Sequence, residues 1–403
     1  MASSSDISIT VFGKTDVGLI REHNEDSLLI ADVTGGTRLT SPDAVQTVTL
    51  GERGVLLLVC DGMGGAAAGE VASTMAVESI SAFMDSGKGL TREAFARRLR
   101  RAIEDANEKI HAQSRDNQSE RGMGTTCTAA GLVDGTLVVG QIGDSRCYVF
   151  RQGELAQVTK DQSLAAQLIE AGALTPEEAK GFEHANIILQ ALGVQERVEV
   201  VLSQAALRRG DIVLLSSDGL HGPVGDDEIR QILAEETDLK AACERLIARA
   251  NEHEGPDNIT VILARMEGDG LPEPQDGDTA KFTPYDPGAD PADPEPERYW
   301  ADKVTAEVTV PSRLRAEELE AAAAAKTATC GSKGRSPAAA VEMRPLLVFV
   351  LLTLIAALAG ALFLVLQRSS IPERRTETAL SSPAQSSAGQ PLVPAASDAG
   401  PPR

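Results

Sequence analysis

The sequence predicts an α+β fold in which two antiparallel β-sheets pack together and helices flank them. Apolar strand-like runs follow one another across short turns, and the clearest pair is joined by Asp134-Gly135, a dipeptide typical of tight hairpins. Amphipathic helical segments separate the groups of strands. Four of the runs begin or end beside an aspartate, so the fold should carry carboxylates on one rim.

The strands are expected before Met266, in runs rich in apolar and β-branched residues. They cover residues 7–14, 27–32, 55–59, 126–133, 137–142, 147–151, 198–202, 212–215 and 259–263. Because several neighbouring runs are joined by hairpin turns, antiparallel pairing is favoured.

Helices are predicted at residues 69–84, after Thr91, within 162–181, and near 226–235 and 238–251. Thr91 should cap its helix, where apolar residues recur on one face; they are Phe95, Leu99, Ile103, Ala106 and Ile110. In the third segment Thr175 and Glu178 form a capping box, with Pro176 at the first helical position. This segment is expected to act as a flap.

The folded domain is expected to cover residues 6–266, because the composition changes there. Residues 267–300 hold seven prolines, ten acidic residues and two basic ones, which leaves too little apolar surface to offset the entropy of ordering. We predict an acidic, Pro-rich disordered linker at residues 267–344 and a disordered tail at 368–403.

A single membrane-spanning helix is predicted at residues 345–367. Residues 346–366 carry no charge over 21 positions, and at about 1.5 Å per residue such a helix spans a roughly 30 Å hydrocarbon core. Basic residues flank both ends and give no orientation. The first residues lack the basic start and apolar core of a signal peptide, so we expect a single-pass protein of the inner, cytoplasmic membrane with its folded domain in the cytoplasm.

Charge and cysteine content argue against two classes of function. The formal net charge of −21 disfavours nucleic-acid binding, since phosphate contacts require a basic face. The five cysteines show no CxxC spacing, which favours buried reduced thiols over a disulfide framework or a zinc site.

The four aspartates at strand ends are Asp61, Asp144, Asp218 and Asp257. If their strands share a sheet, with the fourth antiparallel to its neighbours, these side chains converge on one edge. Hard oxygen ligands gathered in this way suit Mg²⁺ or Mn²⁺. The sequence therefore predicts a metal site built from distant segments.

Three neighbouring features extend this site, and each has a simpler alternative. Gly62 after Asp61 allows a backbone carbonyl to approach an ion, although the motif also fits an ordinary turn that caps a helix. Glu25 and Asp26 are expected to hold metal-bound waters, or else form a solvated acidic turn. The planar fork of Arg21 suits a phosphate; the alternative is a surface ion pair with a nearby glutamate.

A phosphate ester is the substrate that this chemistry implies. Two ions bridged by one carboxylate, for which Asp61 is the candidate, activate a shared water and neutralise charge on a transferring phosphoryl group. The sequence shows no Ser-His-Asp arrangement, HEXXH motif or CX5R segment. Attack by a metal-activated water is therefore favoured over a phosphocysteine route.

Six ordered motifs resemble those of metal-dependent serine/threonine protein phosphatases of the type 2C class, bacterial branch, over about residues 6–266. The motifs are Arg21-Glu22-His23-Asn24-Glu25-Asp26, Asp61-Gly62-Met63-Gly64-Gly65, Gly124-Thr125-Thr126, Gly143-Asp144-Ser145-Arg146, Ser217-Asp218-Gly219 and Asp257-Asn258-Ile259-Thr260. The resemblance implies a four-layer α-β-β-α sandwich with a centre of two Mn²⁺ or Mg²⁺ ions.

Roles for individual residues follow from the resemblance. It implies that Asp61 bridges the ions and that the carbonyl of Gly62 is a ligand. The other implied roles are Asp218 and Asp257 on the first ion, Glu25 on the second through water, Asp144 with Asp218 on a third and weaker ion, Arg21 on the substrate phosphate, and Asp26 and Asn258 as supports behind the ligands. Met63 stands where many animal members have a histidine proposed as the general acid.

The function expected is Mn/Mg-dependent hydrolysis of phosphoserine and phosphothreonine in proteins, by a membrane-tethered enzyme that opposes a serine/threonine kinase. Its partners would be phosphorylated proteins and such a kinase, with the catalytic domain in the cytoplasm. One alternative is a catalytically silent phosphoprotein-binding module of the same fold, and another is a scaffold that acts through its acidic linker. The complete set of carboxylates argues for the enzyme.

Overall fold

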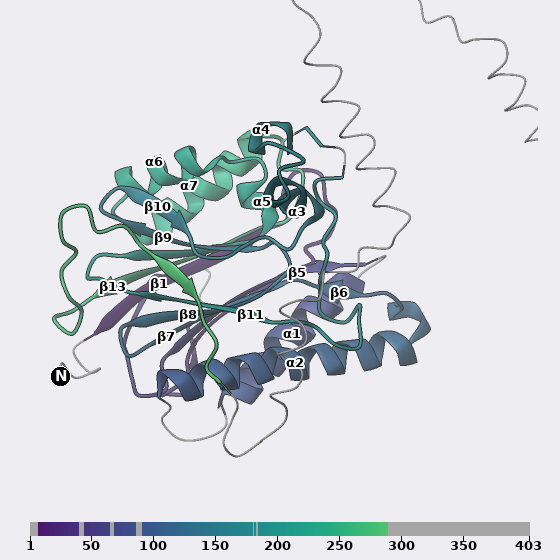
Figure 1. The fold of residues 1–403 in the computed structure, drawn as a ribbon, viewed down its shortest axis with the longest axis horizontal. Helices are drawn as coiled ribbons and strands as arrows, with labels where there is room; N and C mark the ends of the chain where they lie inside the picture. Colours follow the sequence, from purple (N-terminus) through teal and green to yellow (C-terminus); the bar gives the residue numbers. More distant parts are fainter. Residues whose placement is uncertain are drawn as a thin grey trace, which may run out of the picture. The chain divides into compact units, whose positions relative to one another are not determined.

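The computed structural model describes residues 7–39, 44–64, 68–85, 91–179, 181–182 and 184–288. They form two antiparallel sheets packed together with helices on both outer faces, which confirms the predicted sandwich (Figure 1). The predicted membrane helix at 345–367 and the tail at 368–403 lie outside these residues. Among the helices that are described, none has the length and apolar character required to cross a membrane.

The first sheet has the spatial order β10 (Glu154–Gln157), β9 (Arg146–Arg151), β12 (Ile212–Ser216), β13 (Ile259–Glu267), β1 (Ser8–Asp16) and β4 (Gln46–Thr49). The second has the order β14 (Phe282–Pro284), β11 (Val201–Ala206), β8 (Thr136–Ile142), β7 (Cys127–Val133), β5 (Val55–Met63), β2 (Asp26–Asp32) and β3 (Thr37–Arg38), with β6 (Gly124–Thr125) beside β5. Since β5 and β8 both pair antiparallel with β7, their last residues lie at the same end of the sheet.

Helices α1 (Ala68–Asp85) and α2 (Arg92–Asp116) cover the second sheet. The first sheet is covered by α5 (Asp218–His221), α6 (Asp226–Glu235) and α7 (Leu239–Glu252) (Figure 1). Between β10 and β11 the predicted flap carries α3 (Leu164–Glu170) and α4 (Pro176–Ala179). Both predicted caps are confirmed: Ala94 N donates to Thr91 Oγ1 at 3.2 Å, and the capping box of Thr175 and Glu178 forms in both directions.

Three apolar layers hold the sandwich together, one between the sheets and one under each pair of long helices. The predicted stripe on α2 is fully buried, and the ring of Phe95 lies where Gly131 of β7 has no side chain. A Cβ at Gly131 would lie 2.0 Å from Phe95 Cε1, so this helix-on-sheet contact requires glycine. Burying such a ring stabilises the fold by about 2–3 kcal/mol.

The structure decides one condition that the sequence left open and corrects one predicted strand. The four aspartate-bearing strands do not share one sheet, because β5 and β8 belong to the second sheet and β12 and β13 to the first. The strand predicted at 198–202 is β11, which begins at Val201 and ends at Ala206. The prediction ended too early because Ser203 and Gln204 are polar and interrupt the apolar run. Cys60, Cys127, Cys147 and Cys243 are buried free thiols as predicted, while Cys330 lies outside the described residues.

The folded unit extends beyond the boundary predicted at residue 266. Residues 268–288, which we call the strap, continue from β13 across the sandwich (Figure 1). Leu271 is buried between the sheets, β14 pairs with β11, and Asp286 forms an ion pair with Arg100 of α2 at 3.2 Å. Backbone pairing and a few well-placed contacts therefore order this segment despite its proline-rich, acidic composition.

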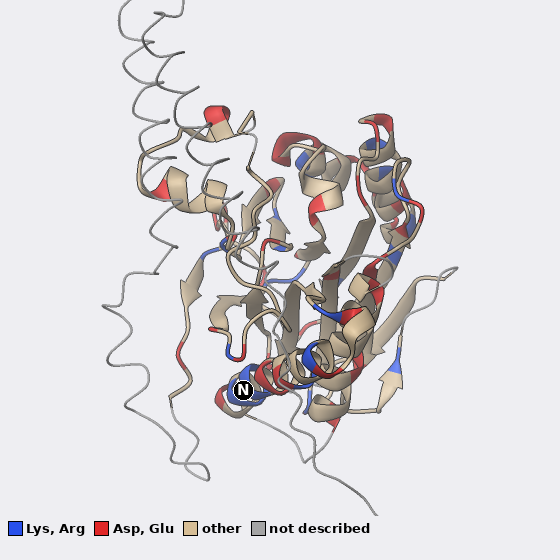
Figure 2. Cartoon of the chain, turned by 90° about the vertical axis from the view of Figure 1, so that its right-hand side faces the viewer, with Lys and Arg blue, Asp and Glu red and all other residues tan. Residues whose placement is uncertain are grey.

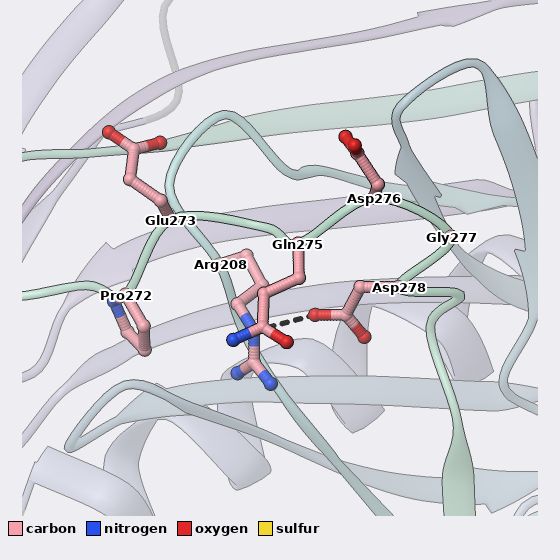
Figure 3. Close-up of a pocket in the computed structure, with 7 residues that line it drawn as sticks. All are labelled: Arg208, Pro272, Glu273, Gln275, Asp276, Gly277 and Asp278. Atoms are coloured by element: carbon pink, nitrogen blue, oxygen red, sulfur yellow. Dashed lines mark hydrogen bonds and ion pairs between the residues drawn. The ribbon is translucent and has the colours of Figure 1, made fainter.

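Buried charges lie where the strap meets the turn before β12. Arg151 donates to both carboxylate oxygens of Asp211 at 2.8 and 2.7 Å, and both side chains are almost fully buried. Asp278 of the strap bonds to Arg151 and Arg208. Figure 3 shows Asp278 bonded to Arg208 beside a small pocket lined by Arg208 and strap residues. Strand β12 begins after Asp211 and ends before Asp218, so Asp211 lies at the end of the sandwich opposite to the predicted metal site.

Charged side chains of both signs share the helical surface. In the view of Figure 2, basic residues on the helices are interspersed with acidic ones rather than gathered into one broad face. Several form exposed ion pairs, such as Arg245 with Glu235 and Arg230 with Asp227.

Replacing Asp211 by Ala should strongly destabilise the fold, because it leaves Arg151 charged and buried with a single carboxylate partner. We expect the free energy of unfolding to fall by about 3 kcal/mol, measured by urea denaturation. The control is Asp269→Ala, which removes a partner of Arg209; the side chain of Asp269 is 91 % exposed. This substitution should change the free energy of unfolding by less than about 0.5 kcal/mol. Equal effects of the two substitutions would contradict this assignment.

Candidate metal and phosphate site

Both sheets contribute carboxylates to one end of the sandwich. Asp61 lies near the end of β5 and Asp144 follows β8, both in the second sheet. From the first sheet, Asp218 begins α5 after β12, and Asp257 precedes β13. In Figure 1 this end carries α5 and β6. The site therefore forms where the two sheets meet, and not along the edge of one.

Glu25 and Gly62 are held together by close backbone packing. Strand β2 places Asp26 directly opposite Asp61, and Gly62 N donates to Glu25 O at 3.2 Å. A Cβ at Gly62 would lie 2.2 Å from Gly69 O and 2.5 Å from Glu25 O. Glycine is therefore required where β5 meets the start of α1, and this requirement explains the Asp-Gly pair in structural terms.

Thr126, for which the sequence predicted no role, fixes the backbone of Asp61. Thr126 N donates to Asp61 O at 2.8 Å, and Asp61 N donates to Thr126 Oγ1 at 2.9 Å. Thr126 Oγ1 also lies 2.8 Å from Ser145 Oγ, next to Asp144. One buried hydroxyl thus connects the backbone of Asp61 to Ser145, the residue that follows Asp144. The only sequence signal for it was the Gly-Thr-Thr motif.

Asp26 is buried and linked to the first sheet. Its Oδ2 accepts from Ser217 Oγ at 2.7 Å and from Thr260 Oγ1 at 2.6 Å. Burial raises the pKa of Asp26 to about 7, although these two hydrogen bonds oppose the shift. Asp26 therefore joins the two sheets directly beside Asp61, while its supporting role at a metal centre stays a prediction.

Asp144 occupies a rigid turn after β8. The backbone N and O of Gly143 both bond to Gln162, which leads into the flap. Burial, with added repulsion from Asp218, raises the pKa of Asp144 to about 7. Its Oδ1 is buried and has no hydrogen-bond partner within the described residues. Two residues later, Arg146 forms a bidentate pair with Asp161 at the base of the flap.

Asp61 and Asp218 come from different sheets, and the charge of Asp218 acts on the carboxyl of Asp61. Burial raises the pKa of both carboxyls, and for Asp61 the neighbouring Asp26, Asp218 and Asp144 raise it further. Asp218 Oδ1 is likewise buried without a hydrogen-bond partner in the described part of the chain. This spot concentrates negative charge, which the partly exposed Arg21 offsets only in part.

Arg21 forms an ion pair with Asp257, its Nη2 lying 2.6 Å from Oδ2. The arginine was predicted to bind phosphate and the aspartate to bind metal, so the structure brings them together but pairs them with each other. Asn258 anchors both segments: its Oδ1 accepts from Glu25 N at 2.8 Å, and its Nδ2 donates to the carbonyls of Val17 and His23 at 2.9 Å.

The described residues do not contain a ready-made cage for a metal ion, since no three His, Cys, Asp or Glu side chains are grouped for one. The donor set nevertheless fits a hard divalent cation. Burial and mutual repulsion raise the pKa values of Asp61, Asp144 and Asp218, and two buried carboxylate oxygens have no partner within the described residues. A bound cation would satisfy these oxygens and relieve the repulsion.

Comparison with known proteins gives the same family throughout. The model of the protein phosphatase 2C family matches residues 37–264. The serine/threonine phosphatase stp of Listeria monocytogenes is 35 % identical over 255 residues, covering 63 % of this chain and 94 % of that protein. The protein phosphatase PhpP of Streptococcus pneumoniae is 38 % identical over 242 residues, covering 59 % and 96 %.

A solved structure of the catalytic domain of the serine/threonine protein phosphatase PstP, in complex with two manganese ions, is also similar. It is 34 % identical, has a TM-score of 0.54, and the match covers 65 % of this chain and 99 % of that one. With the family model matching more than half of the chain and relatives covered almost completely, this chain belongs to the protein phosphatase 2C family and is a protein-serine/threonine phosphatase.

Proposed function

We propose that this chain dephosphorylates phosphoserine and phosphothreonine in proteins with two Mn²⁺ or Mg²⁺ ions, while tethered to a membrane where it opposes a serine/threonine kinase. The observation that carries the catalytic part is the convergence of carboxylates from both sheets at one end of the sandwich. The two partnerless oxygens, Asp144 Oδ1 and Asp218 Oδ1, support occupation by cations.

The charges of Asp26, Asp218 and Asp144 all act on Asp61, which is the proposed bridging ligand. Asp218 and Asp257 would complete one ion's ligands, and Glu25 with the carbonyl of Gly62 would serve the other. When bound, the ions would lower the pKa of a water and neutralise charge on the phosphoryl group. Asp144, whose pKa is raised in part by Asp218, is the proposed ligand with it for a third ion.

Arg21 supplies the phosphate-binding fork in this proposal. Its side chain is 49 % exposed, so it can turn from Asp257 toward a phosphate without crossing the core. Asp257 would then be free to bind a cation. In this proposal Arg21 and Asp257 pair with each other in the empty site. A metal ion would then replace Arg21 as the partner of Asp257, and the substrate phosphate would replace Asp257 as the partner of Arg21. Arginine suits the task because its parallel N–H groups match two phosphate oxygens.

The tethering part of the proposal rests on the sequence alone. The uncharged run at residues 346–366 is long enough to span a bilayer. Confinement to a membrane raises the effective concentration of an enzyme toward substrates held there. A membrane-bound serine/threonine kinase and its phosphorylated targets are the proposed partners for this reason.

Replacing Asp218 by Asn should abolish metal-dependent turnover and stabilise the ion-free protein. The amide removes charge from the crowded site, so the melting temperature without metal should rise, while the further increase on adding Mn²⁺ should largely disappear. Hydrolysis of p-nitrophenyl phosphate and of a phosphothreonine peptide by the full-length chain should fall by about 100-fold or more.

The matched control for this substitution is Asp276→Asn, in the exposed loop at the opposite end of the sandwich, which should change neither quantity. Retained turnover in Asp218→Asn would contradict the ligand assignment. A folded wild-type chain that stays inactive with Mn²⁺ and Mg²⁺ would instead favour the silent phosphoprotein-binding module.

Replacing Arg21 by Ala should lower kcat/KM for phosphopeptides by about 10- to 100-fold, because a charge-assisted pair with phosphate is lost. Arg21→Lys should recover only part of this, since lysine lacks the fork. Arg38→Ala is a suitable control: Arg38 also bonds a carboxylate, Glu78, and is 52 % exposed. Steady-state kinetics with Mn²⁺ measure all three, and equal losses for Arg21→Ala and Arg38→Ala would argue against the phosphate role.

Deleting residues 345–367 should release the chain from membranes without loss of its phosphatase activity. The measurement is the distribution of the full-length and deleted chains between the membrane and soluble fractions of lysed cells, together with turnover of p-nitrophenyl phosphate. A full-length chain recovered wholly in the soluble fraction would contradict the anchor.

A further inference from the structure

The loop between β1 and β2 exposes two adjacent large apolar side chains. Leu19 is 65 % exposed and Ile20 is 67 % exposed, the two highest values among the large apolar residues that the structure describes. Arg21, the proposed phosphate-binding residue, follows immediately. Isolated exposed apolar residues are common on protein surfaces, but this pair lies beside the cation that would hold the substrate.

The loop backbone is fixed, so a mobile segment does not account for this exposure. Leu19 N donates to Gly255 O at 2.9 Å, and Asn258 Nδ2 bonds the carbonyls on either side of the loop. Gly18 has φ +77°, and a Cβ there would lie 2.2 Å from Asp257 O. The loop therefore packs tightly on the segment that carries Asp257.

The same anchor thus presents Arg21 and the apolar pair together. Consecutive Cα atoms are about 3.8 Å apart, so the backbones of Leu19 and Ile20 begin within about 8 Å of that of Arg21. Neither side chain belongs to any of the three apolar layers. The two side chains therefore contribute little to the stability of the fold. A protein substrate whose phosphate binds Arg21 would bury them.

Other segments that border the site also expose apolar side chains. Val194 is 52 % exposed and lies over Gly124, which pairs with Met63 two residues after Asp61. Ile187, in the flap region, is 42 % exposed. Phe282, which is 43 % exposed, lies instead on β14 opposite Ala205, toward the far end of the second sheet.

We propose that Leu19 and Ile20 form an apolar contact for protein substrates, selecting an apolar side chain within about three residues of the phosphorylated serine or threonine. This inference rests on the proposed function, because it takes Arg21 as the phosphate-binding residue. An extended substrate advances about 3.3–3.6 Å per residue, which sets the range of positions that reach the pair. A small aryl phosphate presents no flanking residue and is insensitive to the contact.

The test compares phosphothreonine peptides that carry Leu or Ser at one position at a time, from three residues before to three residues after the phosphothreonine. The full-length chain with Mn²⁺ should show a kcat/KM roughly three- to tenfold higher for Leu at one or more positions, as expected for partial burial of one aliphatic side chain. Each value is divided by kcat/KM for p-nitrophenyl phosphate, so that general effects on the site cancel.

In the double variant Leu19→Ser/Ile20→Ser this preference should fall to less than about twofold. The conservative double variant Leu19→Val/Ile20→Val should keep most of it. Phe282→Ser removes a similarly exposed apolar side chain away from the site and should keep all of it.

A wild-type chain without any preference for Leu would overturn the inference, as would a preference that survives in the serine variant. Both results can occur with normal turnover of p-nitrophenyl phosphate, which leaves the proposed function intact. Absence of that turnover in the wild type overturns the proposed function and, with it, this inference.

Discussion

Crowding of negative charge between the two sheets is the constraint on which the functional end of this molecule depends. Asp61 and Asp218 come from different sheets, yet the charge of Asp218 raises the pKa of Asp61. Holding them together requires a rigid frame, since repulsion favours separation. Thr126 and Asp26 supply much of that frame, because each hydrogen-bonds partners beside a second carboxylate. Hydroxyl groups thus hold in place what Coulomb forces would separate.

The crowding has a cost in stability that depends on pH. The pKa values of Asp26 and Asp144 are raised to about 7 from an ordinary value of 3.8. In the unfolded chain both groups lose their protons near the ordinary value, whereas in the folded chain they retain them longer. As the pH rises from about 3.8 toward 7, the folded chain still binds protons that the unfolded chain has released, so the free energy of unfolding falls. A cation bound at the proposed site would offset this loss, and metal affinity would then be coupled to folding.

Sequence reasoning identified this site better than its surroundings. The four aspartates were found because each adjoins an apolar run. This pattern is local, so it can be recognised in one sequence without an alignment. Their placement on two sheets was missed, since strand order depends on pairing between segments far apart in the chain. The strap was also missed, because β14 is held by backbone hydrogen bonds to β11 that composition does not reveal. The hydroxyl of Thr126 acts through a contact with Ser145 that no local pattern predicts.

The ends of the sandwich differ in how they treat buried charge. At the strap end, Arg151 compensates Asp211 within the protein, so the charges there are balanced and inert. At the other end, Asp144 and Asp218 keep oxygens without partners, and the cation nearest to the site, Arg21, is half-exposed and bonded only to Asp257 among the contacts described. A fold can bury carboxylates with or without a paired arginine. Only carboxylates without such a partner gain a strong interaction when a cation binds. The distribution of compensated and uncompensated carboxylates therefore separates the end that stabilises this molecule from the end that we propose binds cations and substrate.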